Sequence, residues 1–365
     1  MNLKKIILTV TNDLTYDQRM SRICETLDTA GYAVTLIGRE RSYSVALLNK
    51  NYTQIRLKCI FNKGKFFYIE YNIRLFFYLL TNRFDAINAV DLDTLLACFM
   101  ASKIKAKPCI YDAHEYFTEV PEVINRPFIK KIWTGIEAFI IPKLTYCYTV
   151  SDSIAHLFNQ KYKTPFVTIR NVPVLHLQEP QEDNIKTERY LIYQGALNQG
   201  RGLEQLIAAM PLVNCKLYLA GEGDLSDILR EKVDLLQLNH KVKFLGFVQP
   251  STLKTITRKA YLGINVSENL GLSYYYSLNN KCFDYIHAGI PSITNNFPEY
   301  AEINSKYQVA LLVDLSVENL VNSLNSLLLN DVLYQKLKNN CTKASQEFNW
   351  QIEESKLLQL YSQVG

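Results

Sequence analysis

Two stretches in the second half of the sequence combine residue types suited to binding phosphate and hydroxyl groups. Residues 193–207 read YQGALNQGRGLEQLI, so an apolar run ends before Gly195 and Arg201 follows in a glycine-containing loop. Arginine presents a planar fork of N–H donors that matches a diphosphate, and backbone N–H groups at a helix start favour the same anion. A plain strand-to-helix turn with a solvated arginine explains this stretch equally well.

The second stretch, residues 265–293, reads NVSENLGLSYYYSLNNKCFDYIHAGIPSI. Glu268 opens a loop that contains Gly271, and a helix is expected to begin near Lys281 and to carry Asp284. A lysine there can neutralise phosphate, and a carboxylate at a loop-to-helix junction can accept both hydroxyl groups of a ribose. The alternative for Asp284 is a first-turn acid that stabilises the helix dipole.

The first half offers a weaker set of polar residues. His114 and Glu115 follow an apolar run in YDAHE, and His114 is either a group that hydrogen-bonds a sugar or phosphate or a satisfied core histidine. The DLD sequence at residues 91–93 has a spacing that can bind a metal, but N-capping of the helix that follows is favoured. Asp17 and Arg19 suit either ligand contact or capping and surface pairing.

The elements that must position these residues alternate along the chain. Short apolar runs such as KIILTV and AVTLIG are separated by segments of helical periodicity, which predicts doubly wound parallel sheets. The alternation is interrupted by a polar, proline-bearing stretch at residues 172–188. We therefore predict an α/β protein with one Rossmann-like domain at 1–171, a linker at 172–188 and a second such domain at 189–348. Ligands are expected in a cleft between the carboxyl ends of the two sheets.

Composition excludes several classes of protein. No stretch approaches the roughly 18 apolar residues that a membrane-spanning helix needs, and the N-terminal apolar run is too short for a signal peptide. The eight cysteines form no C-x-x-C pair, which favours buried reduced thiols over zinc. We therefore expect a cytoplasmic protein.

Charge is unevenly distributed. The formal net charge is +5, yet residues 39–83 hold nine Lys or Arg residues and two Glu residues. This basic and aromatic segment is either a docking surface for the inner face of the cell membrane or a core helix with solvated lysines. No nucleic-acid-binding motif accompanies it.

The motifs GALNQGRGLEQLIAA, LAGEGD, VKFLGFV, ENLGLS and NKCFDYIHAGIPSI, taken in this order, resemble the nucleotide-binding domain of the family-4 retaining glycosyltransferases. The first half is similar to a branch of that family found in bacterial surface-polysaccharide gene clusters, through YDAHEYFTEVPEV and other stretches. The resemblance implies the GT-B fold, in which two Rossmann-like domains face each other across a cleft. It also implies that the last helix, at residues 349–365, crosses back to the first domain.

The resemblance carries over to individual residues. Arg201 matches the basic position of the diphosphate turn, Asp284 matches the acid that binds the donor ribose, and Gly221-Glu222-Gly223 match a glycine-containing turn after a strand. Two positions depart from the family pattern. Ala196 stands where many members have an arginine, for which Lys281 could compensate, and Tyr276 stands where an acid is usual, which leaves Glu268 as the nearest acid.

The predicted site follows from these assignments. We expect a catalytic role for His114, Glu268, Arg201 and Lys281. Donor binding is assigned to Gly195, Arg201, Gly221, Glu222, Gly223, Leu272, Lys281 and Asp284. No metal ligand is assigned.

The predicted function is transfer of a sugar from a nucleotide diphosphate, most simply a UDP or GDP sugar, to a saccharide or lipid-linked acceptor. Retention at the anomeric carbon and a role in cell-surface polysaccharide biosynthesis are expected. No covalent cofactor, metal or nucleic acid is expected. The alternatives are a nucleotide-sugar 2-epimerase and a non-catalytic nucleotide-sugar-binding protein. A nicotinamide-dependent dehydrogenase is disfavoured because no full G-x-G-x-x-G follows the first strand.

Overall fold

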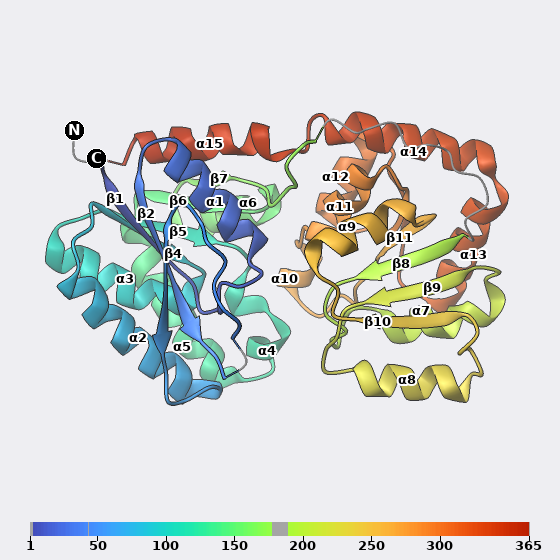
Figure 1. Ribbon diagram of the computed structural model, residues 1–365, viewed down its shortest axis with the longest axis horizontal. Helices are drawn as coiled ribbons and strands as arrows, with labels where there is room; N and C mark the ends of the chain where they lie inside the picture. The colour runs from blue at the N-terminus through green and yellow to red at the C-terminus, as the bar shows by residue number, and fades with distance from the viewer. Residues whose placement is uncertain (1–2, 43, 177–188, 365) are drawn as a thin grey trace. The chain divides into compact units, whose positions relative to one another are not determined.

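The computed structural model describes residues 3–42, 44–176 and 189–364. The chain divides into two compact units, and each is treated by itself (Figure 1). Unit 1 comprises Met1–Asn171 and Glu353–Gly365, and unit 2 comprises Val172–Ile352. The predicted polar segment at 172–188 lies outside the described residues from 177 onward.

Unit 1 is built on a seven-stranded sheet with the order β3-β2-β1-β4-β5-β6-β7, and every strand pair is parallel. Its strands are β1 (Lys5–Thr9), β2 (Ala33–Glu40), β3 (Thr53–Lys58), β4 (Ala86–Val90), β5 (Cys109–Ala113), β6 (Tyr146–Thr149) and β7 (Phe166–Thr168). The central strands β4 and β5 are buried along their whole length. Continuous apolar runs suit strands that are covered on both faces.

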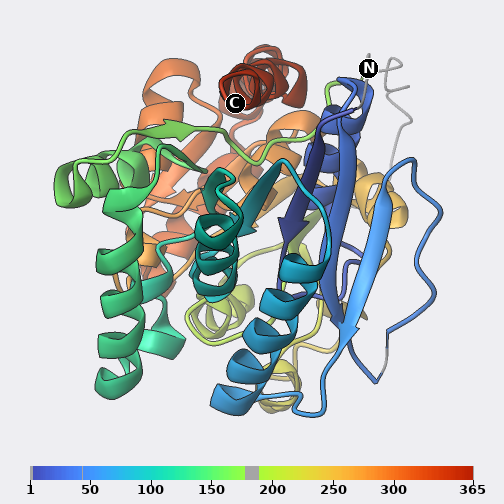
Figure 2. The ribbon, with the colours of Figure 1, turned by 90° about the vertical axis from the view of Figure 1, so that its left-hand side faces the viewer.

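Helices cover both faces of this sheet (Figures 1 and 2). The helices of unit 1, apart from the last one in the chain, are α1 (Gln18–Thr29), α2 (Gly64–Thr81), α3 (Leu92–Lys105), η1 (Phe117–Glu119), α4 (Pro121–Ile124), α5 (Pro127–Ile140), η2 (Ile141–Lys143) and α6 (Asp152–Tyr162). Helices α2, α3 and α5 form one layer, because α2 packs on α3 and α3 packs on α5.

Unit 2 repeats the architecture on a six-stranded parallel sheet with the order β10-β9-β8-β11-β12-β13. Its strands are β8 (Tyr190–Gln194), β9 (Lys216–Ala220), β10 (Val242–Gly246), β11 (Leu262–Asn265), β12 (Ser292–Asn295) and β13 (Ala310–Val313). Its helices are α7 (Leu203–Ala209), η3 (Met210–Leu212), α8 (Ser226–Leu235), α9 (Pro250–Lys259), α10 (Leu272–Tyr275), α11 (Asn280–Ala288), α12 (Pro298–Tyr307), α13 (Val317–Leu329) and α14 (Asp331–Ser345). In both sheets the strand order reverses beside the first strand, which is where ligands bind in open α/β sheets.

The last helix, α15 (Trp350–Ser362), begins in unit 2 and continues into unit 1. At its start, the Trp350 N–H donates to the Pro173 carbonyl at 2.9 Å. Further along, Tyr361 is fully buried and its hydroxyl accepts from Asn88 Nδ2 at 2.6 Å. The chain therefore passes between the units twice, near residue 171 and near residue 352.

The predicted pair of doubly wound sheets is confirmed. The helical stretch before Leu144 is divided into η1, α4, α5 and η2. Prolines at 121, 127 and 142 lie in the first turn of three of these pieces, where the missing N–H is tolerated and a preceding helix must end. Among the described residues, no helix is long and apolar enough to cross a bilayer.

Candidate functional site

Helix α11 is held on the second sheet by Tyr285. The Tyr285 hydroxyl donates to the carbonyls of Ile192 in β8 and Ile264 in β11, each at 3.1 Å. Its ring lies over Gly263, where a Cβ atom would come within 2.3 Å of the ring. Because Lys281 lies four residues earlier on the same helix face, this contact also fixes the position of Lys281.

Lys281 is a buried cation at an unfavourable place. It lies in the first turn of α11, which contains no acidic residue, and only 7% of it is exposed. Its ammonium lies 4.0 Å from the ring centroid of Tyr193, and no carboxylate pairs with it among the described residues. Burial, followed by repulsion from Arg201, holds the pKa of Lys281 well below its usual value. A cation at the positive end of a helix is disfavoured, so this arrangement is suited to an anionic ligand.

Arg201 provides a second cation at the same edge. Its guanidinium lies 4.9 Å from the ring centroid of Tyr274, and it too has no carboxylate partner within the part of the chain that the structure describes. The two cations are close enough for Arg201 to disfavour the charged form of Lys281. The structure thus brings together the two basic residues that the sequence assigned to a diphosphate.

The predicted glycine turns pack against each other. A Cβ atom on Gly221, whose φ is 150°, would lie 2.0 Å from the carbonyl oxygen of Gly195. A Cβ atom on Gly223 would lie 2.2 Å from Oδ1 of Asn198 and 2.6 Å from the carbonyl oxygen of Leu197. The glycines are therefore required by the approach of two backbones, which places the turns after β8 and β9 side by side at the carboxyl edge of the sheet.

The predicted acids of these loops occupy different surroundings. Glu222 pairs with Arg230 at 2.6 Å, so its carboxylate is engaged within unit 2. The Glu268 N–H donates to the Gly200 carbonyl at 2.8 Å, and its carboxylate accepts from Gln205 at 3.3 Å. Glu268 therefore lies beside the loop that carries Arg201. Leu272, which begins α10, is exposed.

Asp284 is not a first-turn acid, because α11 begins at Asn280. Its carboxylate accepts from Gln194 Nε2 at 2.7 Å, and Gln194 Oε1 accepts from the Thr257 hydroxyl at 2.7 Å. Burial lowers the pKa of Lys254, and the nearby negative charge of Asp284 acts in the opposite direction. Asp284 therefore contacts β8 through Gln194 and interacts with Lys254 of α9, and it is not paired with Lys281.

In unit 1, the residues after β4 and β5 are joined through Asp91. Its carboxylate accepts from the backbone N–H of His114 at 2.9 Å, and its own N–H donates to the Asp112 carbonyl at 2.8 Å. The N-capping role favoured for this motif is wrong for Asp91, whose side chain makes no capping bond. Asp93 instead accepts from the Thr11 hydroxyl at 2.6 Å.

His114 is electrically neutral near physiological pH. Burial, with a smaller contribution from Arg19, lowers the pKa of His114 to about 3. A neutral imidazole can both donate and accept a hydrogen bond. His114 is therefore suited to holding a hydroxyl group rather than to neutralising an anion.

The remaining polar residues near β1 have structural partners. Asp17 caps α1 by accepting from the Met20 N–H at 2.8 Å. Arg19 forms a buried two-bond pair with the Asp112 carboxylate, one bond being 2.6 Å long. Arg19 is therefore not a surface residue, and its guanidinium is engaged within unit 1.

Sequence reasoning missed two residues of the unit 2 edge, Tyr193 and Gln194. Both belong to the last residues of β8, which the apolar run predicted as a strand. The signal that pointed to them is their place directly before the Gly195 turn. No group of three or more potential metal ligands occurs among residues 3–42, 44–176 and 189–364.

Comparison with known proteins shows similarity to glycosyltransferases over part of the chain. The model of the family described as Glycosyl transferases group 1 matches residues 177–347. An uncharacterized glycosyltransferase of Methanocaldococcus jannaschii is 42% identical over 77 residues, which cover 20% of this chain and 20% of that protein.

Solved structures extend the likeness to the whole chain. Sucrose-phosphate synthase from Thermosynechococcus elongatus superposes with a TM-score of 0.82 at 16% identity, covering 99% of this chain and 98% of that one. The HepE protein of Anabaena, solved in complex with UDP-glucose, gives a TM-score of 0.75 at 14% identity, covering 98% and 99%. At these identities the likeness shows the fold, which is GT-B.

Proposed function

We propose that the chain is a group 1 glycosyltransferase, whose family model matches residues 177–347, and that it transfers a sugar from a nucleoside diphosphate to a saccharide or lipid-linked acceptor. The observation that carries the proposal is the pair of cations, Lys281 and Arg201, held without a carboxylate partner among the described residues. A buried, unpaired ammonium is costly, and a diphosphate removes that cost.

The donor lies in unit 2 in this proposal. Lys281 and Arg201 bind the diphosphate, and the turns containing Gly195, Gly221 and Gly223 bring backbone close to it. Asp284 accepts the ribose hydroxyls in exchange for Gln194. Glu222, in the turn after β9, and Leu272, at the start of α10, flank the donor. A UDP sugar is the donor of choice, because a protein of the same fold was solved with UDP-glucose.

The chemical step needs charge stabilisation more than a protein nucleophile. An acceptor hydroxyl attacks the anomeric carbon, the bond from that carbon to the phosphate oxygen breaks, and the hydroxyl proton passes to the departing diphosphate. Lys281 and Arg201 stabilise the charge that develops on the leaving group. Glu268 and neutral His114 orient the sugar and the acceptor. Retention at the anomeric carbon follows when attack occurs on the face that the diphosphate leaves.

The acceptor lies in unit 1, and surface-polysaccharide assembly on the inner face of the cell membrane is the proposed setting. Within the basic segment 39–83, helix α2 exposes an apolar stripe of Phe66, Ile69, Ile73 and Phe77. Several basic residues of segment 39–83 form ion pairs, including Lys50 with Glu25 at 2.7 Å and Arg74 with Glu70 at 2.7 Å. The apolar stripe is therefore a better support for membrane contact than the net charge is.

The test is product analysis with labelled UDP-glucose and UDP-galactose, with and without membrane lipid extract. Label appearing in a lipid or saccharide product only when extract is present supports the transferase. Conversion of the sugar nucleotide to an epimer without acceptor would instead establish the 2-epimerase. Binding of the nucleotide with no turnover in any mixture would favour a non-catalytic protein.

A further inference from the structure

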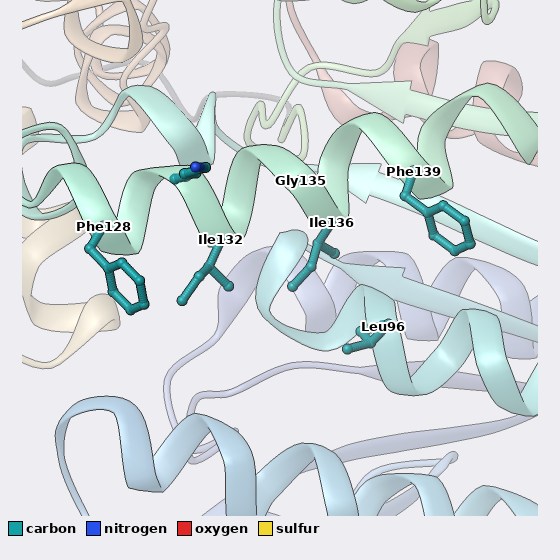
Figure 3. A pocket seen from close by; sticks show the side chains of 7 residues that line it. Leu96, Phe128, Ile132, Gly135, Ile136 and Phe139 are labelled. Carbon is teal, nitrogen blue, oxygen red and sulfur yellow. The ribbon is translucent and has the colours of Figure 1, made fainter.

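The layer formed by α2, α3 and α5 contains a groove whose outer wall is α5 (Figure 3). The groove measures about 530 Å³ and is lined by Leu96, Phe128, Lys131, Ile132, Gly135, Ile136 and Phe139. In Figure 3 the labelled apolar side chains of α5 project from one side of the helix, toward the side on which Leu96 of α3 lies. Phe128, Ile132 and Phe139 are 74%, 45% and 59% exposed. Apolar residues gathered in this way on one helix face mark an interaction site.

Helix α5 is anchored by its opposite side. Glu137, which is fully buried, accepts from Lys161 at 2.8 Å and from the Thr118 hydroxyl at 3.1 Å. Trp133 packs edge-on against Tyr68 and Phe117. Only Glu137 and Ile140 of this helix are buried. Of the exposed stripe, Phe139 contacts Phe99 of α3 edge-on, with ring centroids 6.4 Å apart. The buried anchor of α5 is provided by Glu137 and Ile140 on the other side of the helix.

Gly135 has no structural reason to be glycine. Its φ is not in the left-handed region, and a Cβ atom there would meet nothing within 4 Å. Glycine is disfavoured in a helix interior, so its presence weakens α5. Because Gly135 has no side chain, it deepens the groove that it lines together with Ile132 and Ile136.

The exposed charges of α3 and α5 are all positive. The acidic residues of the two helices, Asp93 and Glu137, are buried. The remaining charged residues are Lys103, Lys105, Lys130 and Lys131. Lys130 pairs with Glu119 at 2.6 Å, whereas Lys131 is exposed and has no ion-pair partner in the described part of the chain.

We propose that α5 lies in the surface of an anionic lipid bilayer, with Phe128, Ile132 and Phe139 among the acyl chains and a hydrocarbon chain in the groove over Gly135. The lysines meet the lipid phosphates, because an amphipathic helix with a basic rim binds through apolar burial and attraction to anionic lipid together. This inference rests on the proposed membrane contact. It assigns the main contact to α5 instead of segment 39–83. It brings unit 1 to the membrane, where a lipid-linked acceptor resides.

The experiment is co-sedimentation of the full chain with vesicles of phosphatidylglycerol and phosphatidylcholine, or of phosphatidylcholine alone. Phe128→Glu/Phe139→Glu is compared with Leu235→Glu/Leu329→Glu, which makes the same charge change at exposed apolar residues of unit 2. We expect the wild type and the control to bind anionic vesicles. The α5 variant should bind them at least about tenfold more weakly. UDP-dependent thermal stabilisation, measured in parallel, should be equal in all three.

Other outcomes overturn the proposal in distinct ways. Equal vesicle binding by the two variants would exclude α5 as the membrane contact and would leave segment 39–83 as the candidate. No binding of the wild type to either vesicle would overturn membrane contact altogether. A concentration-dependent dimer that is lost in the α5 variant, without vesicle binding, would identify a second copy as the partner. Loss of UDP stabilisation in the wild type would count against the transferase proposal instead.

Discussion

Lys281 is the residue on which the proposed donor site depends, and its surroundings predict an unusual response to mutation. Replacing it with methionine removes a buried charge while keeping most of the volume. Since a buried charge without a paired carboxylate is costly, Lys281→Met should not destabilise the nucleotide-free protein. Urea unfolding measures this, with Lys336→Met on the exposed side of α14 as the control. Clear destabilisation by Lys281→Met alone would assign Lys281 a structural role.

Proton uptake gives a second prediction at Lys281. Burial and Arg201 lower its folded pKa, whereas an unfolded lysine has a pKa of about 10.4. Between these values the unfolded chain binds more protons, so the nucleotide-free fold gains stability as pH rises through this window. A bound diphosphate favours the charged ammonium, so UDP binding within this pH window should take up protons. Calorimetry in two buffers of different ionisation enthalpy measures the uptake, which Lys281→Met should reduce.

The sequence predicted which residues are chemically suited to a diphosphate, but not their energetic state. Arg201 and Lys281 were assigned from residue type and position. That Lys281 is buried against Tyr193, at the positive end of a helix, depends on the register of α11 on the sheet, which no local pattern reveals. The same limit explains the error at Asp91, whose side chain reaches a neighbouring strand end instead of its own helix.

At the scale of elements, the site depends on how closely α11 lies on β11. Gly263→Ala would place a Cβ atom 2.3 Å from the Tyr285 ring and push α11 outward. We expect destabilisation of about 1–3 kcal/mol and weaker UDP binding, measured by urea unfolding and calorimetry. Gly135→Ala is the matched control, because nothing lies within 4 Å of its Cβ position. It should stabilise α5 by up to about 1 kcal/mol and leave UDP binding unchanged. Equal effects of the two changes would contradict the close packing of α11.

The sheets were predictable because their strands are continuous apolar runs, such as Ala86–Val90, which is buried throughout. The division of the stretch before Leu144 was not predicted, although Pro121 and Pro127 marked it. A proline ends the preceding helix and begins the next one, so these residues carried the missing signal. The orientation of α5, with its apolar stripe outward, depends on the Glu137 contacts and could not be predicted from periodicity alone.

At the scale of the whole molecule, α15 belongs in large part to unit 1 although it follows unit 2 in the sequence. Deleting residues 353–365 would remove Leu357, Leu360 and Tyr361 from the core and one partner from Asn88. We expect unit 1 to unfold at a lower temperature, while unit 2 keeps its UDP-dependent stabilisation. Scanning calorimetry with and without UDP separates the two transitions. A deletion that leaves both transitions unchanged would show that α15 does not stabilise unit 1.

The central claim is that unit 2 binds a nucleoside diphosphate through Lys281 and Arg201. The most direct measurement is thermal stability of the wild type, Lys281→Met and Asp284→Ala with UDP, GDP or ADP. We predict that one nucleotide, most simply UDP, stabilises the wild type by about 2.7 kcal/mol at a hundredfold excess over Kd. The Lys281→Met variant should show little of this gain and Asp284→Ala a reduced one. No gain with any nucleotide, or an equal gain in Lys281→Met, would contradict the assigned donor site.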